Sequence, residues 1–232
     1  MSTSRKRSAT ARGKSPAIAQ NKEPNIPRPT LIPLGVLDGV TKLFHNIEWE
    51  NLLNLLAHTY HLLTSEFLAD CGLDNERKKV AFQHMGEPMH INFARVNDIL
   101  SLPSSNTFVD FDSLPPKFNH KNFWIEITSG FFSCAGHNIA TSIIHPCLRI
   151  AHRILMCTIF SHKEVVQVTK IEIFFLWCMT RHENPSILDF ASFFFYKCAL
   201  MKTKATGDIC IGVFVTLLAQ DLDIKLLDDY SP

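Results

Sequence analysis

The ten residues TKIEIFFLWC, at positions 169–178, show most clearly what kind of fold this chain adopts. Thr169 and Glu172 have the spacing of a capping box. In such a box the threonine side chain accepts from the third helical residue, and the glutamate reaches back to the free amide of the threonine. The apolar residues that follow are too few to span a bilayer. The stretch therefore predicts the start of a buried core helix.

Two more helices are predicted downstream of this one. Asn184 and Pro185 supply a cap and a first-turn proline for a helix that contains the triple phenylalanine at 193–195. Gly207 and Asp208 open the last helix. We interpret the phenylalanines as core residues rather than as a platform for stacking bases. Short connections between such helices favour antiparallel packing into a bundle.

The N-terminal half combines helical and strand patterns. Apolar residues recur every three or four positions between residues 41 and 70, which predicts one helix or two in sequence, ended by Gly72 in a left-handed conformation. Two short apolar runs within residues 80–91 flank a turn at 85–88 that needs Gly86, and this pattern is typical of a β-hairpin.

A further helix is expected directly after the hairpin. Asn92 caps it, and Leu102-Pro103 ends it. Residues 104–122 have the composition of a long surface loop. The predicted fold is mainly α: a helical bundle-like domain with one small β-hairpin, at about residues 80–91, and a disordered N-terminal tail.

The tail carries a charge opposite to that of the rest of the chain. Residues 1–34 are rich in Ser, Thr, Pro, Lys and Arg, which predicts disorder, and residues 35–232 are expected to form a single domain. Residues 1–30 hold seven basic residues and one acidic residue, a net charge of +6, which leaves −5 for the remainder. The candidate contacts to RNA or DNA in the tail are Arg5, Lys6, Arg7, Arg12 and Lys14. A nuclear import signal and a merely solvated tail are the alternatives.

A second basic segment is predicted on a helix that runs from about His145 to Phe160, with Pro146 in its first turn. Its inner face carries Leu148, Ala151, Leu155 and Ile159. Its outer face is expected to carry His145, Arg149, His152 and Arg153. Arg149 and Arg153 are the candidate contacts to phosphate or to an acidic partner. The alternative is a helix face that is simply solvated.

Three cysteines and three histidines between residues 134 and 157 raise the question of a metal site. His145 and His152 are separated by roughly 10.5 Å along a helix, too far to share one zinc ion. We expect no metal and no cofactor, while Cys134 with His137 stays open. The chain has seven cysteines and no signal segment, which predicts free thiols in a reducing compartment and a protein that is not secreted. Cys157, Cys178 and Cys198 are expected to serve as small hydrophobic residues.

No motif assigns a catalytic residue. Both Gly-rich phosphate-loop patterns are missing from the sequence, and no cysteine stands in the small-residue turn typical of a nucleophile. We therefore expect a protein that is not an enzyme, has no small-molecule substrate and does not span a membrane. A Cys/His hydrolase is retained as an alternative from the enzyme class.

Several segments, in order, resemble the first-open-reading-frame protein of Athila-type plant retrotransposons and the related plant transposon protein domain. They cover about residues 41–222, and the most telling is HPCLRIAHRIL at 145–155, followed by EIFFLWC at 172–178. The resemblance implies an element-encoded, gag-like or accessory protein. Our first hypothesis for such a protein is that its basic tail contacts RNA or DNA and that its body self-associates. The resemblance also implies that proteins of this family are longer than this chain, which leaves open whether the chain is truncated at its C-terminus.

A second resemblance is confined to residues 86–103. The hairpin that leads into a helix and Leu-Pro is similar to the plant mobile domain. It implies the alternative function, a nuclear protein-interaction module whose tail is only an import signal. On either function we expect a nuclear protein, or otherwise a cytoplasmic one.

Overall fold

The structure is a computed structural model of the whole chain. It describes residues 35–55, 57–74, 79–84, 86–104, 111–128, 130, 138–160, 167–181, 188–202 and 211–224. The basic tail, including Arg5, Lys6, Arg7, Arg12 and Lys14, lies outside these residues, as do Cys134 and His137. The same holds for the expected helix starts at Asn184-Pro185 and Gly207-Asp208.

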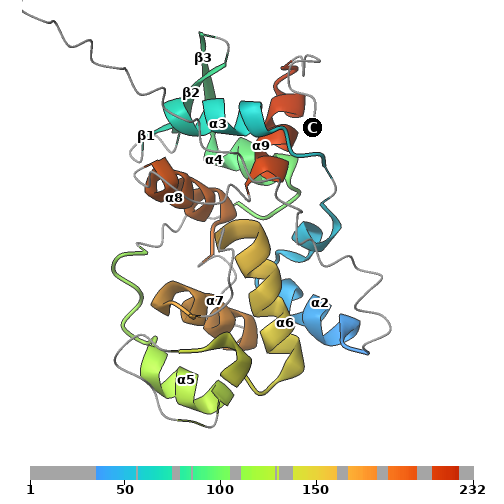
Figure 1. Cartoon of the computed structure of the whole chain (residues 1–232), viewed down its shortest axis with the longest axis vertical. Helices are drawn as coiled ribbons and strands as arrows, with labels where there is room; N and C mark the ends of the chain where they lie inside the picture. The colour runs from blue at the N-terminus through green and yellow to red at the C-terminus, as the bar shows by residue number, and fades with distance from the viewer. Residues whose placement is uncertain are drawn as a thin grey trace, which may run out of the picture.

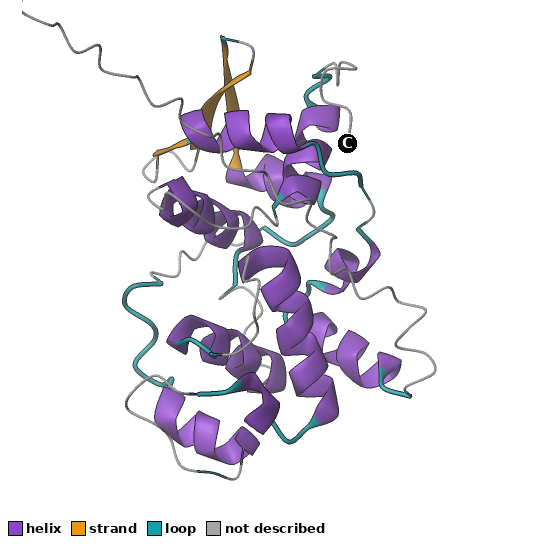
Figure 2. Ribbon diagram, viewed as in Figure 1, coloured by secondary structure: helices purple, strands orange, loops and turns teal. Residues whose placement is uncertain are grey.

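The described residues are mainly helical, as predicted (Figure 2). The α-helices are α2 (Leu37–His45), α3 (His61–Asp70), α4 (Phe93–Ile99), α5 (His120–Thr128), α6 (Pro146–Leu155), α7 (Lys170–Arg181), α8 (Phe190–Lys202) and α9 (Gly212–Asp221). Within the part of the chain that the structure describes, no helix has the length and apolar character needed to cross a membrane.

The helices form two groups that α8 connects (Figure 1). At one end, α9 packs on both α3 and α4, and these two helices also contact the sheet. At the other end, α2 packs on α6 and α7, and α5 packs on α7. Helix α8 contacts α3, α4 and the strand β1 (Gly72–Asp74). It also contacts the π-helical turn at Met156–Phe160, which directly follows α6. The two groups therefore share one core.

The predicted hairpin is confirmed and is part of a larger sheet. Strands β2 (Lys79–His84) and β3 (Glu87–Asn92) pair antiparallel, with Val80 opposite Ile91. Gly86 adopts the left-handed φ of 83° that the tight turn requires. Strand β1 (Gly72–Asp74) adds a third, unpredicted strand on the far side of β2.

Two local expectations around the sheet are wrong. Gly72 does not end α3 in a left-handed conformation, because its backbone continues directly into β1 and pairs with Ala81. Pro88 is not part of the turn but lies within β3, opposite Gln83. A proline is tolerated there because β3 is the edge strand of the sheet.

Helices α2 and α3 begin without a side-chain cap, whereas α4 has one. The region between residues 41 and 70 forms two α-helices, α2 and α3, separated by a 3₁₀ turn at Glu50–Asn54. The backbone amide of Arg95 donates to Asn92 Oδ1 at 2.7 Å, so the predicted cap of α4 is confirmed.

The expectation of a surface loop over residues 104–122 is wrong in part. Phe111 and Phe118 are buried, and α5 already begins at His120. The ring of Phe111 lies 4.9 Å from that of Phe193, and the ring of Phe118 lies 5.1 Å from that of Phe174. These two isolated aromatic residues anchor the segment to the core, although the polar residues around them are typical of a loop.

The capping box at the start of α7 is confirmed. The amide of Glu172 donates to Thr169 Oγ1 at 3.4 Å, and the amide of Thr169 donates to Glu172 Oε2 at 3.2 Å. Helix α8 instead starts later than expected. Asp189 is its cap, because Asp189 Oδ1 accepts from the amide of Ser192 at 2.7 Å.

The core is built largely from aromatic rings. Trp49 is fully buried, and its ring lies 5.4 Å from that of Phe175 and 5.2 Å from that of Phe190. The indole of Trp49 also donates to the carbonyl of Leu188 at 3.2 Å. The triple phenylalanine 193–195 is buried, which confirms that it belongs to the core. The segment after α2 is thereby joined to both α7 and α8.

Candidate nucleic-acid interface on helix α6

Helix α6 is amphipathic and begins where the sequence predicts. Pro146 occupies its first turn, with His145 as the preceding N-cap residue. Leu148, Ala151 and Leu155 are buried. Helix α6 ends at Leu155 and continues as a π-helical turn at Met156–Phe160. The α-helix and this turn together end at Phe160, as predicted.

Arg149 and Arg153 lie one turn apart on the solvent-exposed side of α6. Neither forms an ion pair with a carboxylate among the described residues. The other two arginines that the structure describes are both paired: Arg95 contacts Asp221 at 2.6 Å, and Arg181 contacts Glu126. No carboxylate of the described residues therefore neutralises these two guanidinium groups, although Arg153 also forms a hydrogen bond with Cys157. A guanidinium suits phosphate especially well.

His152 does not belong to this exposed face, contrary to the prediction. It is 1% exposed, and its Nε2 lies 3.0 Å from Glu172 Oε2. The helical spacing explains the error. His152 follows Leu148 by four residues and precedes Leu155 by three, so it lies within the buried stripe.

Glu172 has a role that local sequence could not reveal. Its side chain is also 1% exposed, and it accepts from Thr169 Oγ1 at 2.8 Å as well as contacting His152. One carboxylate thus caps α7 and ties α7 to α6. Because removing either partner of a buried pair leaves the other unsatisfied, we interpret this pair as structural.

The histidines of α6 do not converge on a metal. His145 is exposed at the start of the helix, whereas His152 is buried against α7. No group of three or more His, Cys, Asp or Glu side chains is placed to hold a metal ion within the described ranges. The question of Cys134 and His137 lies outside the described residues.

The described cysteines are free thiols. Cys178 and Cys198 are buried, as expected of small hydrophobic residues, whereas Cys157 is half-buried. Burial raises the pKa of the Cys157 thiol, against the opposing effect of Arg153. Burial, together with a hydrogen bond to Cys71, raises the pKa of Cys198. Both shifts are opposite to the lowered pKa that a thiolate nucleophile needs.

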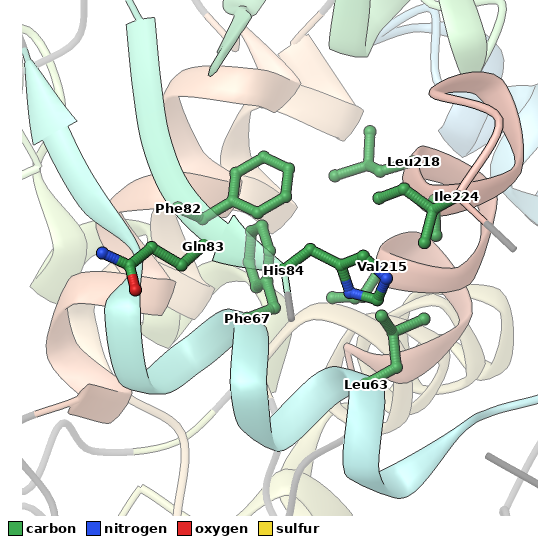
Figure 3. Close-up of a pocket in the computed structure, with 9 residues that line it drawn as sticks. Leu63, Phe67, Phe82, Gln83, His84, Val215, Leu218 and Ile224 are labelled. Carbon is green, nitrogen blue, oxygen red and sulfur yellow. The ribbon is translucent and has the colours of Figure 1, made fainter. Parts of the chain in front are cut away.

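A small apolar cavity lies between α3, β2 and α9 (Figure 3). Its lining includes Leu63, Phe67, Phe82, Leu218 and His84. His84 Nδ1 lies 3.5 Å from Glu66 Oε2. The cavity volume of about 10 Å³ is close to the minimum for one water molecule. It is too small for an organic ligand.

Comparison with known proteins identifies the chain through its sequence. No curated protein and no solved structure matches it. The model of the ATHILA ORF-1 family matches residues 25–179, well over half of the chain. This range includes all of α6 and ends within α7. The chain therefore belongs to the ATHILA ORF-1 family, and it is a retrotransposon-derived protein.

Proposed function

We propose that this chain is a non-enzymatic, gag-like protein that binds nucleic acid through its basic tail, with Arg149 and Arg153 of α6 as contacts on the folded body. Membership of the ATHILA ORF-1 family supports the gag-like role. The observation that carries the binding proposal is the pair of exposed arginines without a carboxylate partner among the described residues. Phosphate backbones bind such side chains with release of counterions, so the affinity falls steeply with salt.

Binding of a single-stranded RNA oligonucleotide by fluorescence anisotropy tests the proposal on the full chain. One variant replaces Arg5, Lys6, Arg7, Arg12 and Lys14 with Gln, and a second carries Arg149→Gln and Arg153→Gln. We expect both variants to weaken binding and to flatten the dependence of log Kd on log salt, because each lost phosphate contact lowers that slope by about 0.7 for a single strand.

Arg95→Gln with Arg181→Gln is the matched control for the second variant, because it also removes two exposed positive charges, which here are paired with carboxylates. We expect it to affect RNA binding less than the α6 variant does. A full chain that binds neither RNA nor DNA at low salt would refute the proposal. That result would favour the nuclear protein-interaction module instead.

Self-association is the second part of the proposed role. Three exposed isoleucines support it: Ile125 of α5, and Ile139 and Ile144 just before α6. The amide of Ile144 donates to the carbonyl of Ile127, so that Ile144 is held at the end of α5. Burial of these exposed apolar side chains against a second copy of the chain would favour association.

Sedimentation velocity with and without RNA tests self-association. We expect assemblies larger than a monomer, and Ile125→Ser with Ile144→Ser is expected to shift them toward the monomer. A monomer at all concentrations, with or without RNA, would contradict this part of the proposal. We further propose a nuclear location, which imaging of the tagged full chain would test by its distribution between nucleus and cytoplasm.

A further inference from the structure

Two of the buried cysteines lie together where helix α8 packs against the junction of α3 and β1 (Figure 1). Cys71 is the C-cap residue of α3, directly before β1, and Cys198 lies on α8. Cys71 is 8% exposed and Cys198 is 1% exposed. A side-chain hydrogen bond joins the two thiols. We call this buried dithiol the Cys71–Cys198 pair.

The aromatic packing beside the pair brings the same two helix faces together. Four residues before each cysteine stands a phenylalanine, Phe67 on α3 and Phe194 on α8, and the centroids of these two rings lie 6.4 Å apart. The amide of Cys71 donates to the carbonyl of Phe67 at 2.9 Å, so the last turn of α3 extends to Cys71. Residues four apart share a helix face, and α8 also contacts β1, which begins directly after Cys71. The contact between the two helices therefore continues from the phenylalanines to the cysteines.

The two thiols differ in their access to solvent. Burial raises the pKa of the Cys198 thiol, and the neighbouring Cys71 raises this pKa further. Cys198 therefore stays protonated and is a poor first nucleophile. Cys71 is the more exposed of the two and adjoins a strand of only three residues at one edge of the sheet. Local opening of this short strand exposes Cys71 before it exposes Cys198.

We propose that the Cys71–Cys198 pair is a redox-sensitive modification site, at which an oxidant of the peroxide class converts the two thiols into one disulfide. The inference does not depend on nucleic-acid binding. In the first step the Cys71 sulfur attacks hydrogen peroxide, so that an S–O bond forms, the O–O bond breaks and one water leaves with the thiol proton.

The second step closes the disulfide. The Cys198 sulfur attacks the Cys71 sulfur, so that the S–S bond forms and the S–O bond breaks. The hydroxyl group leaves with the Cys198 proton as a second water. Both thiols are thereby oxidised to one disulfide, and one peroxide is reduced to two waters. A dithiol reductant reverses the oxidation by thiol–disulfide exchange.

The disulfide ties α8 to the junction of α3 and β1. The bond requires the two sulfurs to approach to about 2.05 Å, and thiols that share a hydrogen bond are already neighbours. Closing the long stretch of chain between residues 71 and 198 restricts the unfolded chain, so the oxidised protein is harder to unfold. Because α8 connects the two groups of helices, oxidation stabilises the packing between them.

Mass spectrometry of the folded full chain tests the proposal without any substitution. The chain is treated with hydrogen peroxide, its remaining thiols are then alkylated in urea, and the protease digest is analysed without reductant. We expect a linked peptide pair that contains Cys71 and Cys198, and we expect dithiothreitol to abolish it. Non-reducing gel electrophoresis should show the linked chain as a monomer, because both thiols belong to one fold.

Urea denaturation before and after the peroxide treatment is the second measurement. We expect oxidation to raise the urea midpoint of the unsubstituted chain and of the control Cys178→Ala, which also removes a buried thiol. Cys71→Ala and Cys198→Ala should show no such rise.

Several outcomes would overturn the inference. They are separate alkylation or over-oxidation of Cys71 and Cys198, a link from either of them to another cysteine, and a link between two copies of the chain. A Cys71–Cys198 link that forms only when urea is present during the peroxide treatment would overturn it too, because the fold would then not bring the thiols together. The same holds for a rise in the urea midpoint that persists in Cys198→Ala.

Discussion

At the scale of single residues, the buried contact between His152 and Glu172 has the largest structural consequence. Both side chains are 1% exposed, and Glu172 also caps α7 through Thr169. The charge pattern of the sequence suggested an exposed His152, whereas the apolar spacing around it already indicated a buried one. Spacing was the better guide because a carboxylate partner offsets part of the cost of burying a histidine.

We expect Glu172→Ala to lower the free energy of unfolding by about 3–5 kcal/mol, because it leaves His152 buried without its partner and removes a helix cap. Urea denaturation of Glu172→Ala, His152→Ala and the double variant would measure this. The double variant should lose less stability than the two single losses added together, since the same contact is removed in both. Additive losses would show that the two side chains do not interact.

His120 makes a prediction about pH. Its pKa is lowered in the folded chain, so below pH 6.5 the unfolded chain binds more protons than the folded one. Stability is therefore higher above pH 6.5 and falls as the pH drops from there toward the folded pKa. Urea midpoints between pH 7.5 and 5.5 should decline less for His120→Gln than for the unsubstituted chain. Parallel pH profiles would contradict the shift.

At the scale of elements, the helix starts show how far local sequence reaches. The caps at Asn92 and Thr169 were predictable because donor and acceptor lie three residues apart. The start of α8 was not predictable in the same way. Asp189 caps α8 and also accepts from Asn97 Nδ2 at 2.8 Å, across 92 residues of sequence. The neighbouring Asn184-Pro185 pair matches the local pattern of a helix start better than Asp189 does.

The packing of α2 on α6 leads to a prediction for Gly39. A Cβ atom at this position would lie 2.5 Å from the sulfur of Cys147. We expect Gly39→Ala to destabilise the fold by about 1–3 kcal/mol through overpacking, although alanine is the better helix former. In a Cys147→Ala background the same substitution should be neutral or stabilising. Thermal unfolding of the four proteins checks this, and an equal cost in both backgrounds would rule out the steric cause.

At the scale of the whole molecule, the hydrophobic core extends beyond the residues that the family model matches. The match ends at residue 179, yet Phe175 of α7 lies 4.6 Å from Phe193 of α8, ring to ring. Trp49 likewise packs against both helices. Helices α8 and α9 therefore complete the core that the matched segment begins.

A chain ending at residue 179 should accordingly lose cooperative unfolding, because the rings that face α8 would be exposed to water. Near-ultraviolet circular dichroism and heat denaturation would detect the loss of fixed tertiary packing. A cooperative transition at the same temperature as the full chain would show that the matched segment folds by itself. The full-length chain under the same conditions is the reference.

The sequence by itself determined the helical class, the hairpin at about residues 80–91, the caps at Asn92 and Thr169, and the family. The helical class, the hairpin and the caps depend on residues a few positions apart in the chain. The family resemblance depends on the order of whole segments. Only the tertiary structure decided that β1 joins the sheet, that His152 meets Glu172, and that α5 packs on α7. Such contacts join residues far apart in the chain, and they form because burial of the aromatic core brings distant elements together.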